Sequence, residues 1–185
     1  LPHADKALES NDAAKQEAAK FMQNAFSTEN DWRLTDLNTR ISLVRQLLAT
    51  IATVDIVDEL ADDLNSTLAA ARSQLISIEK RLKKPRSLPG PTGESNVLYL
   101  EPRGILVCFA DKDVTFEYWA LSIVTALATG NVVISVVSEL FYAEAIEFRQ
   151  QFIATGVPEG VFQVAKLHHL QPLLAEEKLA GVVID

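Results

Sequence analysis

The fold is decided by the stretch Pro102–Glu139, which reads PRGILVCFADKDVTFEYWALSIVTALATGNVVISVVSE. Residues 105–109 form a nearly continuous apolar run, as expected for a strand that is covered on both faces. Apolar residues then recur at helical spacing up to Gly130-Asn131, a pair that suits the end of a helix. Residues 132–137 are again mostly aliphatic. The stretch therefore predicts a strand, a helix and a parallel second strand, joined by a right-handed crossover.

The connection between the first of these strands and the helix is polar and turn-like, since it reads Asp111-Lys112-Asp113. A carboxylate directly before a helix accepts hydrogen bonds from the first N–H groups of that helix. We therefore expect Asp113 to cap a helix that begins near Val114.

The residues after Glu139 repeat this strand and helix pattern. An amphipathic helix is expected between Phe141 and Ile153, and Gly156-Val157-Pro158 ends it. Residues 161–164, 167–176 and 179–184 then predict a strand, a short helix and a strand. Strands and helices that alternate in this way predict an α/β protein with a Rossmann-like, doubly wound parallel sheet.

The first part of the chain reads as a helical region, residues 1–86, ahead of this Rossmann part, residues 87–185. Residues 1–10 are expected to be frayed, and an alanine-rich helix is expected over Asn11–Phe26. The polar residues 27–33 should break that helix. Two more amphipathic helices are expected, one from about Thr35 and a long one from about Val54 to Lys83.

Three prolines and two glycines in Pro85–Gly93 require the chain to leave the last of these helices. Residues 97–100 then read as a short strand, and Glu101–Gly104 as a turn. We expect this short strand to form a β-hairpin with the strand that begins at Ile105.

Composition excludes several classes of protein. The 185 residues are 48% hydrophobic and 23% charged, which is ordinary for a globular chain. The net charge of −8 argues against non-specific binding to nucleic acid or to an anionic membrane. One cysteine excludes an internal disulfide, and no apolar run is long enough to span a bilayer. These features favour a cytoplasmic setting, and the two ends of the chain suggest a fragment of a longer polypeptide.

The segment Leu88–Asn96, LPGPTGESN, followed by Pro102-Arg103-Gly104 and the βαβ unit, resembles the aldehyde dehydrogenase superfamily. Within that superfamily the likeness is strongest to the aldehyde-dehydrogenase-like parts of the bacterial proline utilization A (PutA) proteins. It covers residues 88–185, roughly half of the chain. PutA proteins join a proline dehydrogenase to an L-glutamate γ-semialdehyde dehydrogenase, and long versions add a C-terminal domain of the same fold without catalytic apparatus.

Two positions differ from the catalytic family, and a third matches it. Where the family has an asparagine that donates a hydrogen bond to the developing oxyanion, this chain has Asp113, whose negative charge would oppose that oxyanion. Where the family has a lysine that holds the adenosine ribose of NAD, this chain has Val136. Glu139 matches the family's ribose-binding glutamate, but alone it reads better as a charge at a helix N-terminus.

The resemblance therefore implies a non-catalytic domain that helps to enclose the path of the semialdehyde intermediate between two active sites. It implies no catalytic residue, no cofactor and no metal in this segment, while the parent protein would carry FAD and NAD. The expected partners are other domains of the parent or a second copy of the chain. Two alternatives remain open: part of an active NAD-dependent aldehyde dehydrogenase, and an oligomerisation or regulatory module.

The remaining candidates have structural explanations. Cys108 lies inside the first core strand and matches a structural position of the family rather than its nucleophile. His168-His169 would need further metal ligands that the sequence does not reveal, so packing or surface exposure is expected. The basic cluster at Lys80-Arg81 and Lys83-Lys84 suits the negative end of a helix dipole, with a phosphate-binding patch as the alternative.

Overall fold

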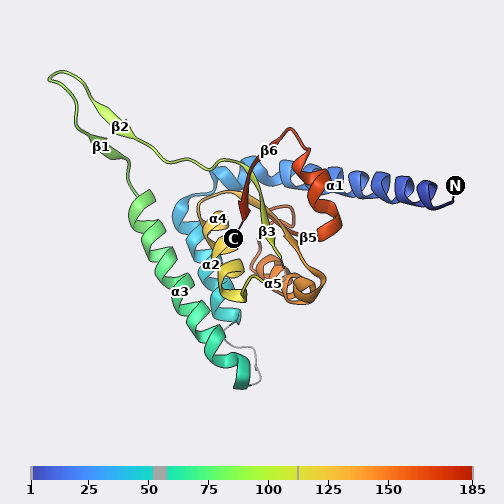
Figure 1. The fold of residues 1–185 in the computed structure, drawn as a ribbon. Coiled ribbons are helices and arrows are strands. Elements are labelled where there is room, and N and C mark those ends of the chain that lie inside the picture. Colours follow the sequence, from blue (N-terminus) through green and yellow to red (C-terminus); the bar gives the residue numbers. More distant parts are fainter. Residues whose placement is uncertain (1, 52–57, 112, 185) are drawn as a thin grey trace.

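The computed structural model describes residues 2–51, 58–111 and 113–184, which form helices and strands in a mixed α/β arrangement (Figure 1). The helices are α1 (Pro2–Leu34), α2 (Leu37–Ile51), α3 (Asp58–Leu82), α4 (Phe116–Ala128), α5 (Tyr142–Ala154) and α6 (Leu170–Leu174), with 3₁₀ turns η1 (Glu139–Phe141) and η2 (Leu167–His169). The strands are β1 (Arg86–Leu88), β2 (Asn96–Leu98), β3 (Ile105–Ala110), β4 (Val132–Val137), β5 (Phe162–Lys166) and β6 (Leu179–Ile184).

A four-stranded parallel sheet forms the centre, with strand order β5-β4-β3-β6. The chain moves outward from β3 to β5 and then crosses back to place β6 on the other side of β3, which is a doubly wound topology. The predicted fold class is thus confirmed. The βαβ unit of the decisive stretch is confirmed as well, and Gly130 ends α4 with a positive φ of 91°.

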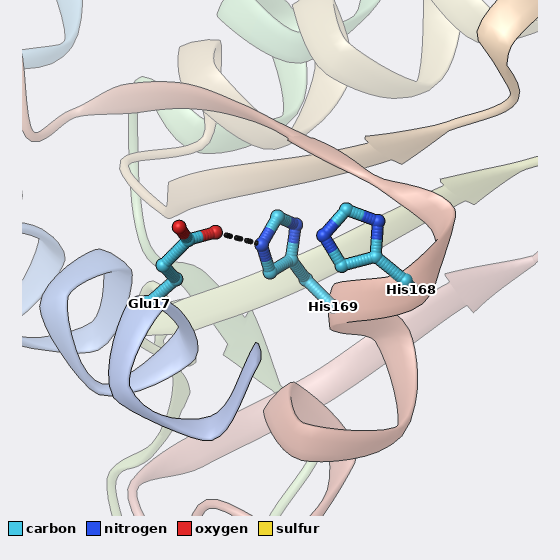
Figure 2. Close-up of side chains that lie close together, drawn as sticks. All are labelled: Glu17, His168 and His169. Carbon is cyan, nitrogen blue, oxygen red and sulfur yellow. Dashed lines mark hydrogen bonds and ion pairs between the residues drawn. The ribbon is translucent and has the colours of Figure 1, made fainter. Parts of the chain in front are cut away.

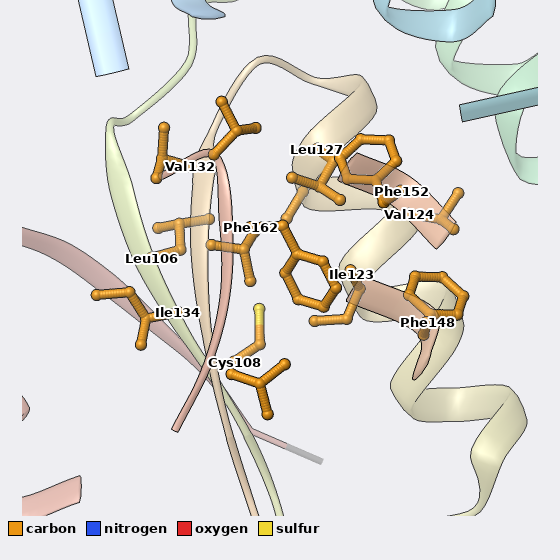
Figure 3. Close-up of a cluster of buried hydrophobic side chains, with 14 of the residues drawn as sticks. Leu106, Cys108, Ile123, Val124, Leu127, Val132, Ile134, Phe148, Phe152 and Phe162 are labelled. Atoms are coloured by element: carbon orange, nitrogen blue, oxygen red, sulfur yellow. The ribbon is translucent and has the colours of Figure 1, made fainter. Parts of the chain in front are cut away.

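Helices cover both faces of the sheet. On one face α4 and α5 pack against β3, β4 and β5, and α2 and α3 form a further layer behind α4 (Figure 1). On the opposite face α1 crosses β3, β4 and β5, and the amide of Gln163 in β5 donates a hydrogen bond of 2.9 Å to the carbonyl of Phe21. Figure 3 shows part of the buried apolar cluster, in which Phe162, Ile123 and Phe148 lie between the sheet and α4 and α5.

Helix α1 is longer than the sequence indicated. The prediction of a frayed segment over residues 1–10 and of a break over residues 27–33 was wrong, because one helix runs from Pro2 to Leu34. The hydroxyls of Ser27 and Thr28 bond to carbonyls in the preceding turn, which leaves the helix intact. Packing then stabilises the polar segment, since Trp32 is only 3% exposed.

The strand predicted to pair with β2 in a hairpin was the wrong one. Strand β2 pairs antiparallel with β1, not with β3, and the two form a separate two-stranded ribbon that extends away from the body of the molecule (Figure 1). The segment Pro85–Gly93 leaves the helix as expected, but it contains strand β1 and folds back on β2. The predicted start of the long helix near Val54 lies outside the described residues.

The cap of α4 is Thr115 rather than Asp113. The hydroxyl oxygen of Thr115 accepts a hydrogen bond of 3.3 Å from the backbone N–H of Tyr118, and the helix begins at Phe116. Asp113 is exposed in the loop before it. The shift of two residues leaves the Asp113 carboxylate without its predicted role at the helix end.

A buried hydrogen bond joins α4 to the sheet, and it can be tested by mutation. The indole N–H of Trp119 donates to Ser135 Oγ over 2.8 Å, and both side chains are buried. We expect Ser135→Ala to destabilise the protein by about 1–3 kcal/mol in urea unfolding, because the indole N–H loses its acceptor. Ser122→Ala, on the outer side of the same helix, should change stability by less than about 0.5 kcal/mol. Equal effects of the two substitutions would contradict this account.

Candidate functional site

The carboxyl ends of β3 and β4 lie side by side, because Ala110 and Val137 are paired in register. In doubly wound sheets, ligands bind in the crevice outside the carboxyl ends of the strands. Asp113 follows β3 and Glu139 follows β4, so the fold brings both predicted positions to this edge. Both residues are exposed.

Val136 occupies a different environment from the other two positions. It lies within β4, paired with Phe109 on one side and Ala165 on the other, and its exposure is 0%. Side chains alternate along a strand, which places Val136 on the same face as Gln163, the face covered by α1. The Val136 side chain is therefore part of the core and is not available to a ligand.

Glu139 has a partner that the sequence did not reveal. Lys166, the last residue of β5, approaches the Glu139 carboxylate to 3.2 Å, and its ammonium lies 5.0 Å from the ring centre of Tyr142. Both charged side chains are substantially exposed, so the pair contributes little to stability. The pairing follows from the register, since Lys166 lies opposite Val137 at the end of the neighbouring strand.

Aromatic rings pack between the start of α4 and the segment after β4. Phe116, the first residue of α4, and Phe141 in η1 have ring centroids 5.9 Å apart. Trp119 lies 5.1 Å from Phe141 in an edge-to-face arrangement. The hydroxyl of Ser138, between β4 and η1, is buried and has no hydrogen-bond partner among the described residues. This edge of the sheet thus combines an apolar wall with one unsatisfied polar atom.

Cys108 lies in the core below this edge and is 2% exposed (Figure 3). Burial raises the pKa of its thiol to about 12. The thiol is therefore protonated at neutral pH and lacks the thiolate that a nucleophile needs.

A second polar cluster joins α1 to η2 (Figure 2). The His169 ring is 5% exposed, and its Nε2 lies 2.5 Å from Oε2 of Glu17. The neighbouring His168 is exposed, and its ring centroid lies 3.9 Å from that of His169. His168 is thus at the surface and His169 is packed against α1, and the sequence held no signal for Glu17, which lies 152 residues away.

The root of the ribbon carries the basic cluster. Lys80 and Arg81 occupy the last turn of α3, where positive side chains interact favourably with the negative end of the helix dipole. Arg81, Lys84 and Arg86 also line a small cavity of about 70 Å³ together with Tyr99. These are the side chains that would hold a phosphate in the alternative reading of the basic cluster.

The strand order defines a Rossmann-like α/β protein, and in this class of fold the ends of strands such as β3 and β4 are where ligands bind. The model of the aldehyde dehydrogenase family matches residues 2–182, so the chain belongs to this family. The match extends through the helical region, where the sequence showed no specific motif.

Several known proteins are similar to this chain in sequence or in fold. A hydroxyisobutyraldehyde dehydrogenase of Mycolicibacterium austroafricanum is 29% identical over 147 residues, which cover 72% of this chain and 29% of the relative. The structure of PutA from Bradyrhizobium japonicum superposes with a TM-score of 0.78 at 22% identity, over 98% of this chain and 21% of that one.

A glyceraldehyde-3-phosphate dehydrogenase from Methanocaldococcus jannaschii, in complex with NADP, superposes with a TM-score of 0.76 at 16% identity, over 92% of this chain and 41% of that one. The chain thus spans less than half the length of each of these relatives. Among the described residues, no helix combines the length and the apolar character needed to cross a lipid bilayer.

The contact between α1 and η2 predicts a dependence of stability on pH. The hydrogen bond with His169 lowers the pKa of Glu17 from its ordinary value of 4.5. The stabilisation is therefore complete above the unfolded pKa of Glu17 and is lost as pH falls through the lower folded pKa. In metal-free buffer we expect Glu17→Gln to be less stable than the parent chain at neutral pH. In urea unfolding from about pH 7 to about pH 3, that difference should shrink in the acid range. A constant difference would contradict this assignment.

Proposed function

We propose that this chain is part of a non-catalytic aldehyde-dehydrogenase-like domain of a bifunctional proline dehydrogenase and L-glutamate γ-semialdehyde dehydrogenase. Its role there is to enclose the path along which the intermediate of proline breakdown to glutamate passes between two active sites. The observation that carries the proposal is the edge formed by β3 and β4. At this edge Val136 is buried in the core and Glu139 is paired with Lys166.

The residues at this edge do not fit the ribose of a nicotinamide dinucleotide. A ribose diol is held by charged or polar groups that reach out of the strand ends, and an aliphatic side chain with no exposed surface offers none. The rings of Phe116 and Phe141 add apolar bulk between the start of α4 and η1. This segment therefore carries no NAD of its own in the proposal, and the FAD and NAD of the parent belong to its catalytic modules.

The charge of Asp113 also opposes catalysis. An acyl-transfer site stabilises a developing oxyanion with hydrogen-bond donors. An exposed carboxylate in the loop after β3 brings a negative charge to that place instead, and two such charges repel. The geometry supports a rigid surface rather than a reacting centre.

The ribbon of β1 and β2 supports a role in contact with other protein surfaces. All six of its strand residues are exposed, and a two-stranded ribbon on its own has marginal stability in water. Tyr99 and Leu100, directly after β2, are 65% and 60% exposed. Apolar surface of this kind favours contact with other domains of the parent or with a second copy of the chain.

Specific observations favour each of two alternatives. The unsatisfied buried hydroxyl of Ser138 at the end of β4, together with relatives that are dehydrogenases, favours part of an active NAD-dependent aldehyde dehydrogenase. The exposed ribbon alone would also suit an oligomerisation or regulatory module that has no part in intermediate transfer.

An equilibrium titration with NAD separates the first alternative from the proposal. We expect the complete domain that contains this chain to show no saturable binding of NAD, because Val136 and Glu139 do not supply a ribose site. The semialdehyde dehydrogenase module of the same parent serves as the positive control. Saturable binding in the micromolar range would favour the active dehydrogenase.

Removal of the ribbon tests its role in the parent protein. We expect replacement of residues 86–100 by a short glycine-serine linker to release more free semialdehyde and to slow the coupled reaction, while each separate activity persists. Substitution of the exposed Leu140, which lies outside the ribbon, by serine is the control. Unchanged coupling with a smaller particle in ultracentrifugation would favour the oligomerisation module instead.

A further inference from the structure

The cluster of Glu17, His168 and His169 offers three metal-ligating atoms, all within 4.8 Å of one another. Two of these atoms come from imidazoles and one from a carboxylate (Figure 2). This donor set suits zinc and its neighbours among the first-row transition metals better than calcium or magnesium, which prefer oxygen ligands. The cluster lies between α1 and η2, directly after the carboxyl end of β5, and it is next to Lys166, the partner of Glu139.

The position of the His169 proton follows from its hydrogen bonds. The backbone N–H of Lys166 donates to Nδ1 over 3.2 Å, so neutral His169 carries its ring proton on Nε2. That proton lies between Nε2 and the Glu17 carboxylate. The edge-to-face contact with Phe21, at 5.4 Å between ring centroids, helps to fix the ring. One imidazole and one carboxylate are thus already directed at a shared point.

We propose that Glu17, His168 and His169 bind a divalent transition-metal ion of the zinc type, which takes the place of the proton between Nε2 and the carboxylate. Ligands at 2.0–2.2 Å in a tetrahedral site lie about 3.3 Å from one another. Glu17 must therefore move away from His169 slightly, and His168 must approach. Both are exposed side chains that can rotate, whereas the buried His169 stays in place. A water completes the fourth position.

Binding releases no proton from His169 to the solvent, because its ring proton moves from Nε2 to Nδ1 when the ion takes Nε2. A neutral imidazole that is ligated through Nε2 carries its proton on Nδ1, so the hydrogen bond from Lys166 is lost when the ion binds. This loss lowers the affinity of the site for the ion, so we expect moderate rather than very tight binding. The bound ion joins α1 to the segment after β5, and because it binds only the folded chain, it raises the stability of the fold.

Calorimetric titration of the EDTA-treated, dialysed chain with zinc chloride tests the proposal at pH 7.5. We expect one saturable site whose heat of binding does not depend on the ionisation enthalpy of the buffer, because the neutral imidazoles and the carboxylate bind the ion without net loss of a proton. Glu17→Gln and His168→Gln should each weaken binding at least tenfold, since each removes a ligand. His3→Gln, which removes the remaining histidine, should leave binding unchanged.

A second measurement locates the ion even if a variant folds poorly. In the parent chain, zinc should shift the amide resonance of Lys166 in a ¹H–¹⁵N spectrum, because that amide loses its acceptor. The proposal is overturned if the parent chain shows no saturable binding. It is equally overturned if binding persists in both Glu17→Gln and His168→Gln, or if saturation leaves the Lys166 resonance in place.

Discussion

The structure depends on one constraint: the central parallel strands are apolar on both faces, so both faces must be covered. Helices α4 and α5 cover one face as the crossovers of the sheet itself. The other face is covered by α1, which comes from the far end of the sequence. The approach is close, since a Cβ at Gly160 would clash with the carbonyl oxygen of Asn24. Helix α1 is therefore part of the Rossmann core, although the sequence separates it from the strands by about 70 residues.

Arg40 links the helices at the other end of the sheet. Its guanidinium donates to the carbonyl of Ala128 at the end of α4 and to those of Trp32, Arg33 and Thr35 at and just after the end of α1. Burial lowers the pKa of this guanidinium, yet arginine remains charged at any ordinary pH. A cation at two helix C-termini satisfies unpaired carbonyls and opposes both negative dipole ends. One buried side chain of α2 thus joins the C-terminal ends of α1 and α4.

Local signals predicted the sheet well, and non-local contacts account for the errors. Residues 179–184 formed the predicted strand, because an apolar run beside turn residues has few other solutions. The break over residues 27–33 was wrong, because Trp32 is buried by groups that the local sequence does not show. The partner of β2 and the contact between Glu17 and His169 could not be predicted, since both depend on which distant segments meet.

We propose that this family fold serves here without a dinucleotide site of its own. The chain belongs to the aldehyde dehydrogenase family, but at the ends of β3 and β4 it presents Asp113, a buried Val136 and a Glu139 paired with Lys166. The most direct measurement is a crystal structure of the complete domain after soaking with NAD. The account predicts no dinucleotide at this edge and an intact contact between Glu139 and Lys166. A dinucleotide bound beside Ser138, with its ribose on Glu139, would contradict it.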